Sequence, residues 1–326
     1  MPHASRPAAA DTQSRTELIA HEPVEALAGL LDVGLPDPRG WVPPLWHWLY
    51  LLDRRPQGHL GPDGHPSSGI PAPPGPGLRR MFAGGRIQTY RLLEIGRPAT
   101  RTVRVAKTST RQGRSGPLTF VTVRHEISQD EETAIIEEQD IVYRAADTGS
   151  LPTGPGAQVA PLAGEPKLSL AVTESLLFRF SALTYNAHRI HYDHRWAQRE
   201  GYEDLVVHGP LQALMMGELL RRNGVQQVGR EFAFRLVAPL VGPQTIVATA
   251  GEQGLGAGAQ IRDVSGRVTA ASTLGPLVAP SSLGEGLPAV GLPPSVSGVA
   301  DDSVGGLPRT ATAALWPWAT GREGDS

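Results

Sequence analysis

One order of patterns constrains the fold most strongly: a helix followed by several strands, which occurs twice along the chain. Its clearest instance is Gly209–Arg222, where apolar residues recur at helical spacing and two C-terminal arginines favour the helix dipole. Strand patterns follow at Arg230–Val237, Thr245–Ala250, Gly258–Arg262 and Arg267–Ser272. We therefore expect an antiparallel sheet packed around this helix, which is an α+β architecture.

The first half of the chain has the same order. Helices are predicted at Val24–Leu31 and Pro43–Leu52, each of which begins at or next to a proline. Strands are then predicted at Ile87–Leu93, Arg101–Thr108, Pro117–Glu126 and Ala134–Tyr143. A strand at Leu168–Val172 and a helix at Leu176–Leu183 are predicted to open the second half. The pattern indicates two tandem units, each a helix wrapped by an antiparallel sheet.

Glycine and proline set the predicted domain boundaries, because these residues are concentrated in a few segments. Residues 148–166 are predicted to link a first unit, residues 16–147, to a second unit, residues 167–274. Residues 1–15 read as a disordered leader. Residues 275–326 show no periodicity, so they bury too little apolar surface to offset the entropy of ordering. We predict a disordered tail there.

Composition and spacing argue against several classes of site and partner. The chain has 30 basic and 32 acidic residues, which provides no general attraction for nucleic acid or an anionic membrane. It has no cysteine and no apolar stretch of about 18 residues, so disulfides and membrane helices are not expected. His188, His191 and His194 could not converge on one ion from a helix, and no metal is predicted. These observations favour a soluble, cytoplasmic protein.

The densest group of polar side chains lies in Phe180–Asp193, between two apolar segments. Asn186, His188, His191 and Asp193 can exchange protons or orient water near neutral pH. A structural role stays open for two of them, His188 as a loop-bracing group and Asp193 as a helix N-cap. The segment is our candidate for the chemical site.

A helix start follows this segment in the sequence. His208 and Gly209 stand at the beginning of the predicted helix Gly209–Arg222. A backbone N–H at such a position is a preformed donor for developing negative charge. A purely structural role is equally open for His208. The sequence thus combines a candidate base with a candidate oxyanion donor.

At these residues the chain resembles a known family. The stretches FSALTYNAHRIHYD and EGYEDLVVHGPLQALMM resemble type 2 (R-specific) enoyl-CoA hydratases and hydroxyacyl-thioester dehydratases type 2. Further stretches resemble the N-terminal domain of mesaconyl-C4-CoA (3-methylfumaryl-CoA) hydratases: PPLWHWLYLL, GPDGHP, RRMFAGGRI, GRSGPLTFVTVRHEI and EEQDIVYR. The resemblance extends from about Pro23 to Ala271. It implies a double hot-dog fold, in which the second unit carries the hydratase motif.

The family pattern Asp-x-Asn-Pro-x-His implies roles for individual residues. Anchored on His191, this pattern places Asn186 where the family has Asp, and His188 and Arg189 at the Asn and Pro positions. An amide has no ionisable proton, so Asn186 can only position water, and proton transfer falls to His191. Gly209 would supply the oxyanion donor.

Three further residues are predicted to contact substrate: Tyr185, His208 and Arg189, the last by pairing with a second carboxylate on the acyl chain. The implied activity is that of a hydro-lyase acting on an α,β-unsaturated acyl-CoA, with conversion of mesaconyl-C4-CoA to citramalyl-CoA as one candidate. No metal or organic cofactor is expected, and a homodimer is compatible with the family. Three alternatives stay open: a fatty-acid or polyketide 3-hydroxyacyl-thioester dehydratase, a hot-dog thioesterase, and a non-catalytic acyl-thioester binding subunit.

Overall fold

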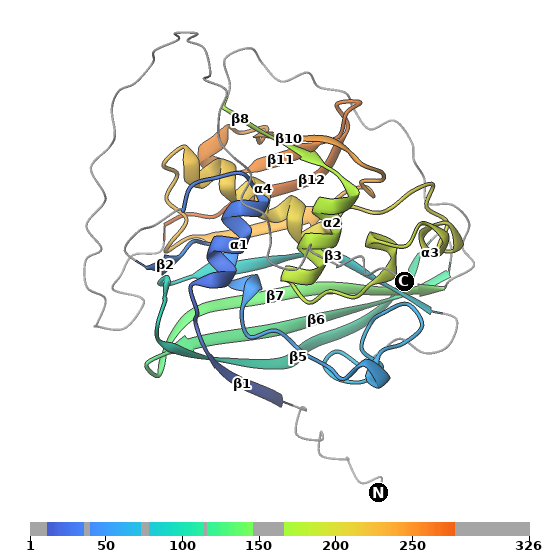
Figure 1. Ribbon diagram of the computed structural model, residues 1–326, viewed down its shortest axis with the longest axis horizontal. Helices are drawn as coiled ribbons and strands as arrows, with labels where there is room; N and C mark the ends of the chain where they lie inside the picture. Colours follow the sequence, from blue (N-terminus) through green and yellow to red (C-terminus); the bar gives the residue numbers. More distant parts are fainter. Residues whose placement is uncertain (1–11, 36–39, 73–77, 114–115, 146–165, 278–326) are drawn as a thin grey trace, which may run out of the picture. The chain divides into compact units, whose positions relative to one another are not determined.

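Ten strands form one antiparallel sheet in the computed structural model, which describes residues 12–35, 40–72, 78–113, 116–145 and 166–277. The order of the strands is β1-β5-β6-β7-β3-β9-β12-β11-β10-β8 (Figure 1). The first half contains β1 (Thr12–Leu18), α1 (Glu22–Leu30), β2 (Trp41–Val42), η1 (Trp46–Leu49), η2 (Gln57–His59), β3 (Leu78–Thr89), β4 (Leu93–Glu94), β5 (Pro98–Gly113), β6 (Gly116–Gln129) and β7 (Glu132–Ala145). The second half contains β8 (Lys167–Val172), α2 (Glu174–Leu183), η3 (Arg189–His191), α3 (His194–Arg199), α4 (Gly209–Arg222), β9 (Glu231–Leu236), β10 (Gln244–Ala250), η4 (Leu255–Ala257), β11 (Ala259–Arg262) and β12 (Val268–Leu274).

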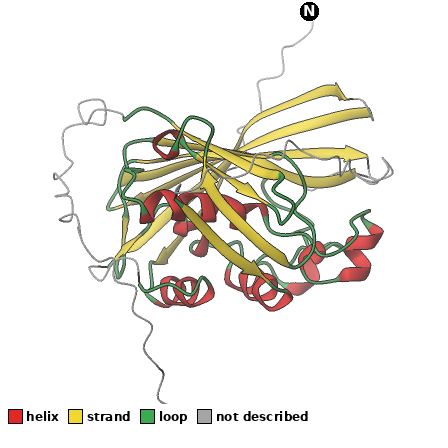
Figure 2. Cartoon of the chain, turned by 90° about the horizontal axis from the view of Figure 1, so that it is seen from above, coloured by secondary structure: helices red, strands yellow, loops and turns green. Residues whose placement is uncertain are grey.

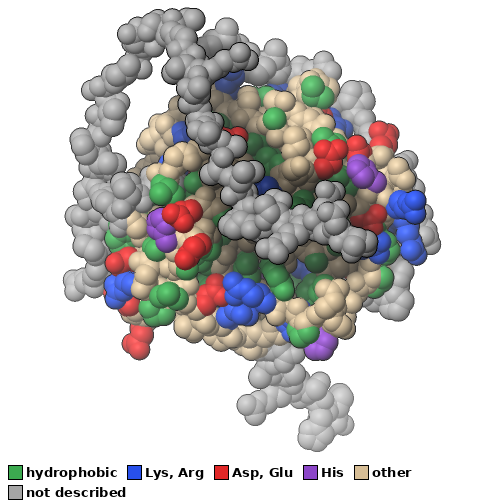
Figure 3. Space-filling model, in the orientation of Figure 1, with side chains coloured by type: hydrophobic (Ala, Val, Ile, Leu, Met, Phe, Trp, Pro, Cys, Tyr) green, Lys and Arg blue, Asp and Glu red, His purple; other side chains and the backbone are tan. Residues whose placement is uncertain are grey.

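Helix α4 is the centre of the second unit. Every residue from Leu211 to Leu220 is buried, because β10, β11 and β12 wrap around the helix. Figure 2 shows most of the helices on one side of the sheet. Charged side chains of both signs are interspersed on the face shown in Figure 3. The predicted bounds of α4 are confirmed.

The two units join through one pair of strands, β3 and β9. At this junction Gly84 has a φ of +150°, and a Cβ there would lie 2.3 Å from the carbonyl oxygen of Phe234. A glycine is therefore needed for the strands to approach this closely. Two helix-and-sheet units joined edge to edge confirm the α+β class and the predicted double hot-dog fold.

The predicted helix Pro43–Leu52 was wrong. The structure has only the short 3-10 helix η1 at Trp46–Leu49, and Leu45 and Leu51 beside it have left-handed φ values of 71° and 56°. A tertiary contact favours this backbone, because the indole N–H of Trp46 donates to Glu218 Oε1 of α4 at 2.9 Å. Among the described residues, the first unit therefore has no helix equivalent in length to α4.

The predicted leader needs a correction at its end. Thr12–Leu18 form strand β1 and pair with β5, which supplies the backbone hydrogen bonds that an isolated leader would lack. Residues 1–11 of the leader, residues 148–165 of the predicted linker and residues 278–326 of the predicted tail lie outside the described residues. Across the ranges that the structure describes, no helix is both long and apolar enough to span a membrane.

Candidate active site

The polar segment predicted to carry the chemistry connects helices α2 and α3. Its second end is fixed by Asp193, whose Oδ1 accepts a hydrogen bond from the backbone N–H of Trp196 at 3.1 Å, so the predicted N-cap is confirmed. Tyr185 has a left-handed φ of 53°, which turns the chain at the end of α2. The next residue, Asn186, donates its backbone N–H to the carbonyl of Ser181 at 2.8 Å. The segment is therefore held at both ends.

One ring nitrogen of His191 makes a hydrogen bond, and the other makes none with the described residues. Its Nδ1 lies 2.7 Å from the carbonyl oxygen of Val206, and a carbonyl can only accept, so Nδ1 carries the proton. Nε2 then keeps its lone pair. Burial lowers the pKa of His191 well below its ordinary value, and the neighbouring His208 and His188 lower it further. The imidazole is thus neutral at pH 7 and able to accept a proton.

His208 lies flat against His191. The two rings are stacked with centroids 3.6 Å apart, and His208 Nε2 lies 2.8 Å from the hydroxyl of Ser181. The His208 side chain is completely buried, and burial lowers its pKa to about 3. This arrangement fixes the plane of the His191 ring. The predicted contact between His208 and substrate stays a prediction.

Gly209 begins helix α4 directly after His208. Its backbone N–H makes no hydrogen bond with the described residues, as expected for the first residue of a helix. A Cβ at this position would lie 2.4 Å from Leu236 Cδ1 and 3.0 Å from Phe82 Cδ1. Glycine therefore allows the start of α4 to pack closely against β9 and β3. The N–H is in place as a candidate oxyanion donor.

Asn186 is held by hydrogen bonds that leave its NH2 group available. Its Oδ1 accepts the backbone N–H of His188 at 3.0 Å, which fixes the side chain in a tight turn. The NH2 group makes no hydrogen bond with the described residues. This side chain can therefore donate to a water molecule, but it cannot remove a proton from one.

A cavity of about 410 Å³ lies beside this segment, between residues of the two units. Its lining residues are Asp53, Arg55, Gln57, Leu60, Gly64, His65, Pro66, Phe178, Ser181, Ala182, Tyr185, Asn186, Ala187 and Tyr192. Tyr185 and Asn186, both predicted site residues, thus meet at the cavity. His191, His208 and Gly209 form a second group behind the lining, connected to it through the hydrogen bond between His208 and Ser181.

Arg189 is not among the lining residues. Its Nε and Nη2 donate to Asp193 Oδ2 at 3.0 and 2.6 Å, and its guanidinium lies 4.2 Å from the ring centre of Trp196. Nη1 donates to the carbonyl of Pro62, and the backbone N–H donates to the carbonyl of Asp63. Arg189 therefore fastens a loop of the first unit to the catalytic segment. The predicted pairing with a substrate carboxylate stays a prediction.

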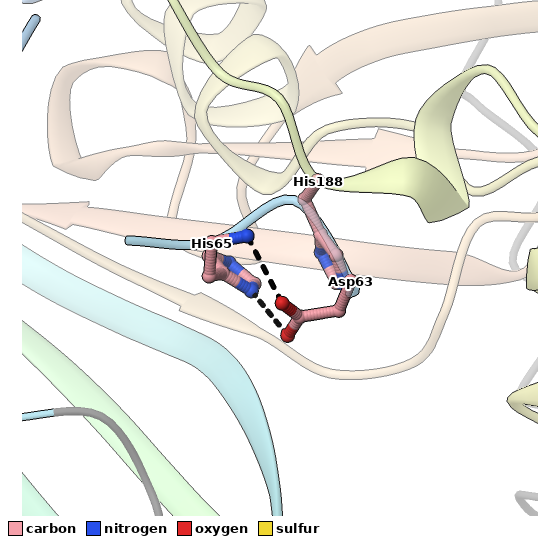
Figure 4. Close-up of side chains that lie close together, drawn as sticks. All are labelled: Asp63, His65 and His188. Carbon is pink, nitrogen blue, oxygen red and sulfur yellow. Dashed lines mark hydrogen bonds and ion pairs between the residues drawn. The ribbon is translucent and has the colours of Figure 1, made fainter. Parts of the chain in front are cut away.

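That loop brings in two functional groups that the residue-by-residue prediction missed. Asp63 accepts the backbone N–H and Nδ1–H of His65, both at 3.0 Å, and the His65 ring lies 4.0 Å from that of His188 (Figure 4). The available signal is the stretch GPDGHP, which belongs to the resemblance in the first unit. Ligand-type atoms of Asp63, His65 and His188 lie within 4.8 Å of one another, a spacing that would also suit a metal ion.

The pKa shifts of Asp63 and His65 determine the charge of each group at pH 7. Burial lowers the pKa of His65 to about 4, although the hydrogen bond with Asp63 acts in the opposite direction. For Asp63, burial alone raises the pKa, but the hydrogen bonds from His65 outweigh it and hold the pKa below its ordinary value. At pH 7 the pair is thus a carboxylate and a neutral imidazole. Nδ1 of His65 carries the proton, and Nε2 keeps its lone pair.

Solved structures support the fold class. A MaoC-like dehydratase from Phytophthora capsici superposes with a TM-score of 0.59 at 15% identity, over 83% of this chain and 96% of that chain. At this identity the likeness concerns the fold alone. The hot-dog architecture found above is thus shared with solved dehydratases.

Sequence comparisons identify the family. A family model for hydroxyacyl-thioester dehydratase type 2 matches residues 45–242. A mesaconyl-C4-CoA hydratase of Chloroflexus aurantiacus is 50% identical over 216 residues, which is 64% of this chain and 74% of the relative. A mitochondrial hydroxyacyl-thioester dehydratase type 2 of Schizosaccharomyces pombe is 26% identical over 60% of this chain and 73% of the relative. The chain belongs to the hydroxyacyl-thioester dehydratase type 2 family.

Proposed function

We propose that this protein is a hydro-lyase that adds water to, or removes it from, an α,β-unsaturated acyl-CoA thioester. The observation that carries the proposal is the state of His191, a buried neutral imidazole with a protonated Nδ1 and a free Nε2. A neutral imidazole with a free lone pair can accept a proton from water as a general base. The 50% identical relative named mesaconyl-C4-CoA hydratase supports the same reaction class.

In the hydration direction, His191 Nε2 takes a proton from a water molecule held by the NH2 group of Asn186. The hydroxide forms a bond to the β-carbon, and the electron pair of the double bond moves onto the thioester. The N–H of Gly209 stabilises the resulting enolate, and His191 then returns the proton to the α-carbon. A single oxyanion donor is typically worth about 3–4 kcal/mol, and a positioned general base roughly 10²–10⁴ in rate. Dehydration is the reverse.

The acyl group is the finer part of the proposal. We favour a short, branched dicarboxyl acyl group such as mesaconyl-C4, since the relative from Chloroflexus aurantiacus is named for it. A second carboxylate needs a cationic partner at the cavity. Both arginines pair with a carboxylate, Arg55 with Asp53 and Arg189 with Asp193, but Arg55 lines the cavity and Arg189 does not. This placement supports Arg55 over Arg189 as the partner.

The competing functions differ in their products, in turnover and in the acyl chains they prefer. A thioesterase would liberate free CoA thiol, and a non-catalytic binding subunit would bind acyl-CoA without turnover. A fatty-acid or polyketide dehydratase would prefer longer acyl chains without a second carboxylate. The free Nε2 of His191 supports catalysis over passive binding.

The test is a panel of enoyl-CoAs assayed with the purified protein at the absorbance of the enoyl-thioester band, together with a thiol assay. We expect hydration of mesaconyl-C4-CoA to exceed that of crotonyl-CoA and of longer enoyl-CoAs, without thiol release. Thiol release would indicate a thioesterase. Binding without turnover across the whole panel would refute the hydro-lyase.

Two arginine variants sharpen the assignment of substrate. Arg55→Ala should lose activity on mesaconyl-C4-CoA selectively, because crotonyl-CoA has no second carboxylate to pair. Arg189→Ala should slow both substrates alike, because it loosens the loop of the first unit. A selective loss in Arg189→Ala, with Arg55→Ala unaffected, would restore the assignment predicted from the sequence.

A further inference from the structure

The loop of the first unit that contains Asp63, Gly64 and His65 packs tightly against the catalytic segment of the second unit. Gly64 has a φ of +89°, and a Cβ there would lie 1.8 Å from the carbonyl oxygen of Ala187. The residue before it, Asp63, accepts the backbone N–H of Arg189 at 2.9 Å. Contact this close requires a glycine at this position. The position of the loop relative to the site is therefore fixed by backbone contacts.

The loop places His65 in a cluster of four imidazoles, in which each ring lies close to at least one other. Ring centroids are 4.0 Å apart from His65 to His188, 5.6 Å from His188 to His191, and 3.6 Å from His191 to His208. His65 also lines the cavity, as Asn186 does. His65 and His191 thus both pack against the ring of His188.

The catalytic segment offers few hydrogen-bond acceptors to the attacking water. A water molecule that attacks the substrate has two O–H groups, and His191 Nε2 can accept only one of them. A carboxylate at position 186 would accept the other, but this chain has an amide there. The amide oxygen of Asn186 already accepts the N–H of His188. One lone pair remains on that oxygen, so the second O–H can be accepted there or by a group on another element.

We propose that His65, oriented by Asp63, is this second acceptor and so replaces the carboxylate that the motif lacks. His65 Nε2 accepts one O–H of the attacking water while His191 takes the proton of the other. Asp63 fixes the tautomer of His65 by accepting its Nδ1–H. The His65 proton does not move, so the proton balance of the reaction is unchanged. The proposal rests on the hydro-lyase function, and it makes the first unit part of the active site.

The test compares steady-state hydration by wild type, Asp63→Asn, His65→Ala and His65→Gln on the enoyl-CoA that the wild type converts fastest. His65→Ala should lower kcat about tenfold to a hundredfold with little change in KM, as for loss of one hydrogen bond to a reacting group. His65→Gln keeps an acceptor and should recover part of that loss. Asp63→Asn should resemble His65→Ala, because the amide can donate to Nδ1 and turn Nε2 into a donor.

Controls separate this role from folding and from metal binding. His59→Ala changes an exposed histidine nearby and should behave like wild type. Wild-type kcat in His65→Ala, or equal losses in the Ala and Gln variants, would overturn the proposal. So would one equivalent of a divalent metal in the purified wild type that is absent from His65→Ala, since His65 would then be a ligand. Failure of the hydro-lyase itself would show separately, as a lack of turnover by the wild type.

Discussion

The two units surround their buried histidines with different partners. In the first unit, His47 Nε2 lies 3.1 Å from Glu137 Oε2, and the other oxygen of Glu137 accepts the side chains of Trp48 and Gln139, each at 2.8 Å. In the second unit, His191 bonds only to a backbone carbonyl. Glu137 thus holds His47 in the first unit, as Asp63 holds His65 and Glu200 lies 3.5 Å from His188, whereas no carboxylate holds His191.

The difference identifies which buried cluster is structural. Burial alone raises the pKa of Glu137, but the hydrogen bond and charge of His47 outweigh it and lower the pKa to about 2. Glu137 is buried, accepts hydrogen bonds from three side chains and does not line the cavity. We therefore assign Glu137 to stability and His191 to catalysis.

The largest effect on stability is expected for Glu137→Ala, which leaves three donors without their acceptor. Its free energy of unfolding should fall by roughly 3–5 kcal/mol, as for other broken buried pairs. The adjacent Glu138, which is half-buried and pairs with the more exposed Arg86 and Arg124, is the control, and Glu138→Ala should cost less, about 1 kcal/mol. Urea unfolding measures both. Equal stability of the two variants would remove the distinction between the units.

The pH dependence of the same experiment follows from the lowered pKa. A carboxyl group whose folded pKa lies below its unfolded value stabilises the fold above the unfolded value. This contribution is lost as the pH falls from about 4.5 towards 2. Wild type should therefore lose stability steeply over that range, and Glu137→Ala should lose less. Parallel curves would contradict the assignment.

A smaller effect is expected at the contact between the units. In Gly64→Ala the new methyl group would meet the carbonyl of Ala187 and the left-handed backbone would be strained, so we expect a loss of about 1–3 kcal/mol. Hydratase kcat should fall as well, because the loop carrying His65 is displaced. Gly58→Ala, where a Cβ has open space, is the matched control. Wild-type stability and kcat in Gly64→Ala would show that the loop is not held as described.

Sequence patterns predicted local structure better than contacts between distant residues. The bounds of α4 followed from apolar residues at helical spacing, and the helix packs against β10, β11 and β12. The stretch Pro43–Leu52 has an apolar composition typical of a helix, but the bond from Trp46 to Glu218 across the units decides its conformation. The approach of His65 to His188 depends on a contact between units, which periodicity does not encode.

The most direct test of the account is the kcat of His191→Asn, measured with the enoyl-CoA that the wild type converts fastest. Asparagine can still donate to the carbonyl of Val206 but cannot accept a proton from water, so the fold is kept and the base is removed. We predict a fall in kcat of roughly 10²–10⁴ with a circular dichroism spectrum like that of wild type. A folded His191→Asn variant with wild-type kcat would contradict the central claim that His191 is the base.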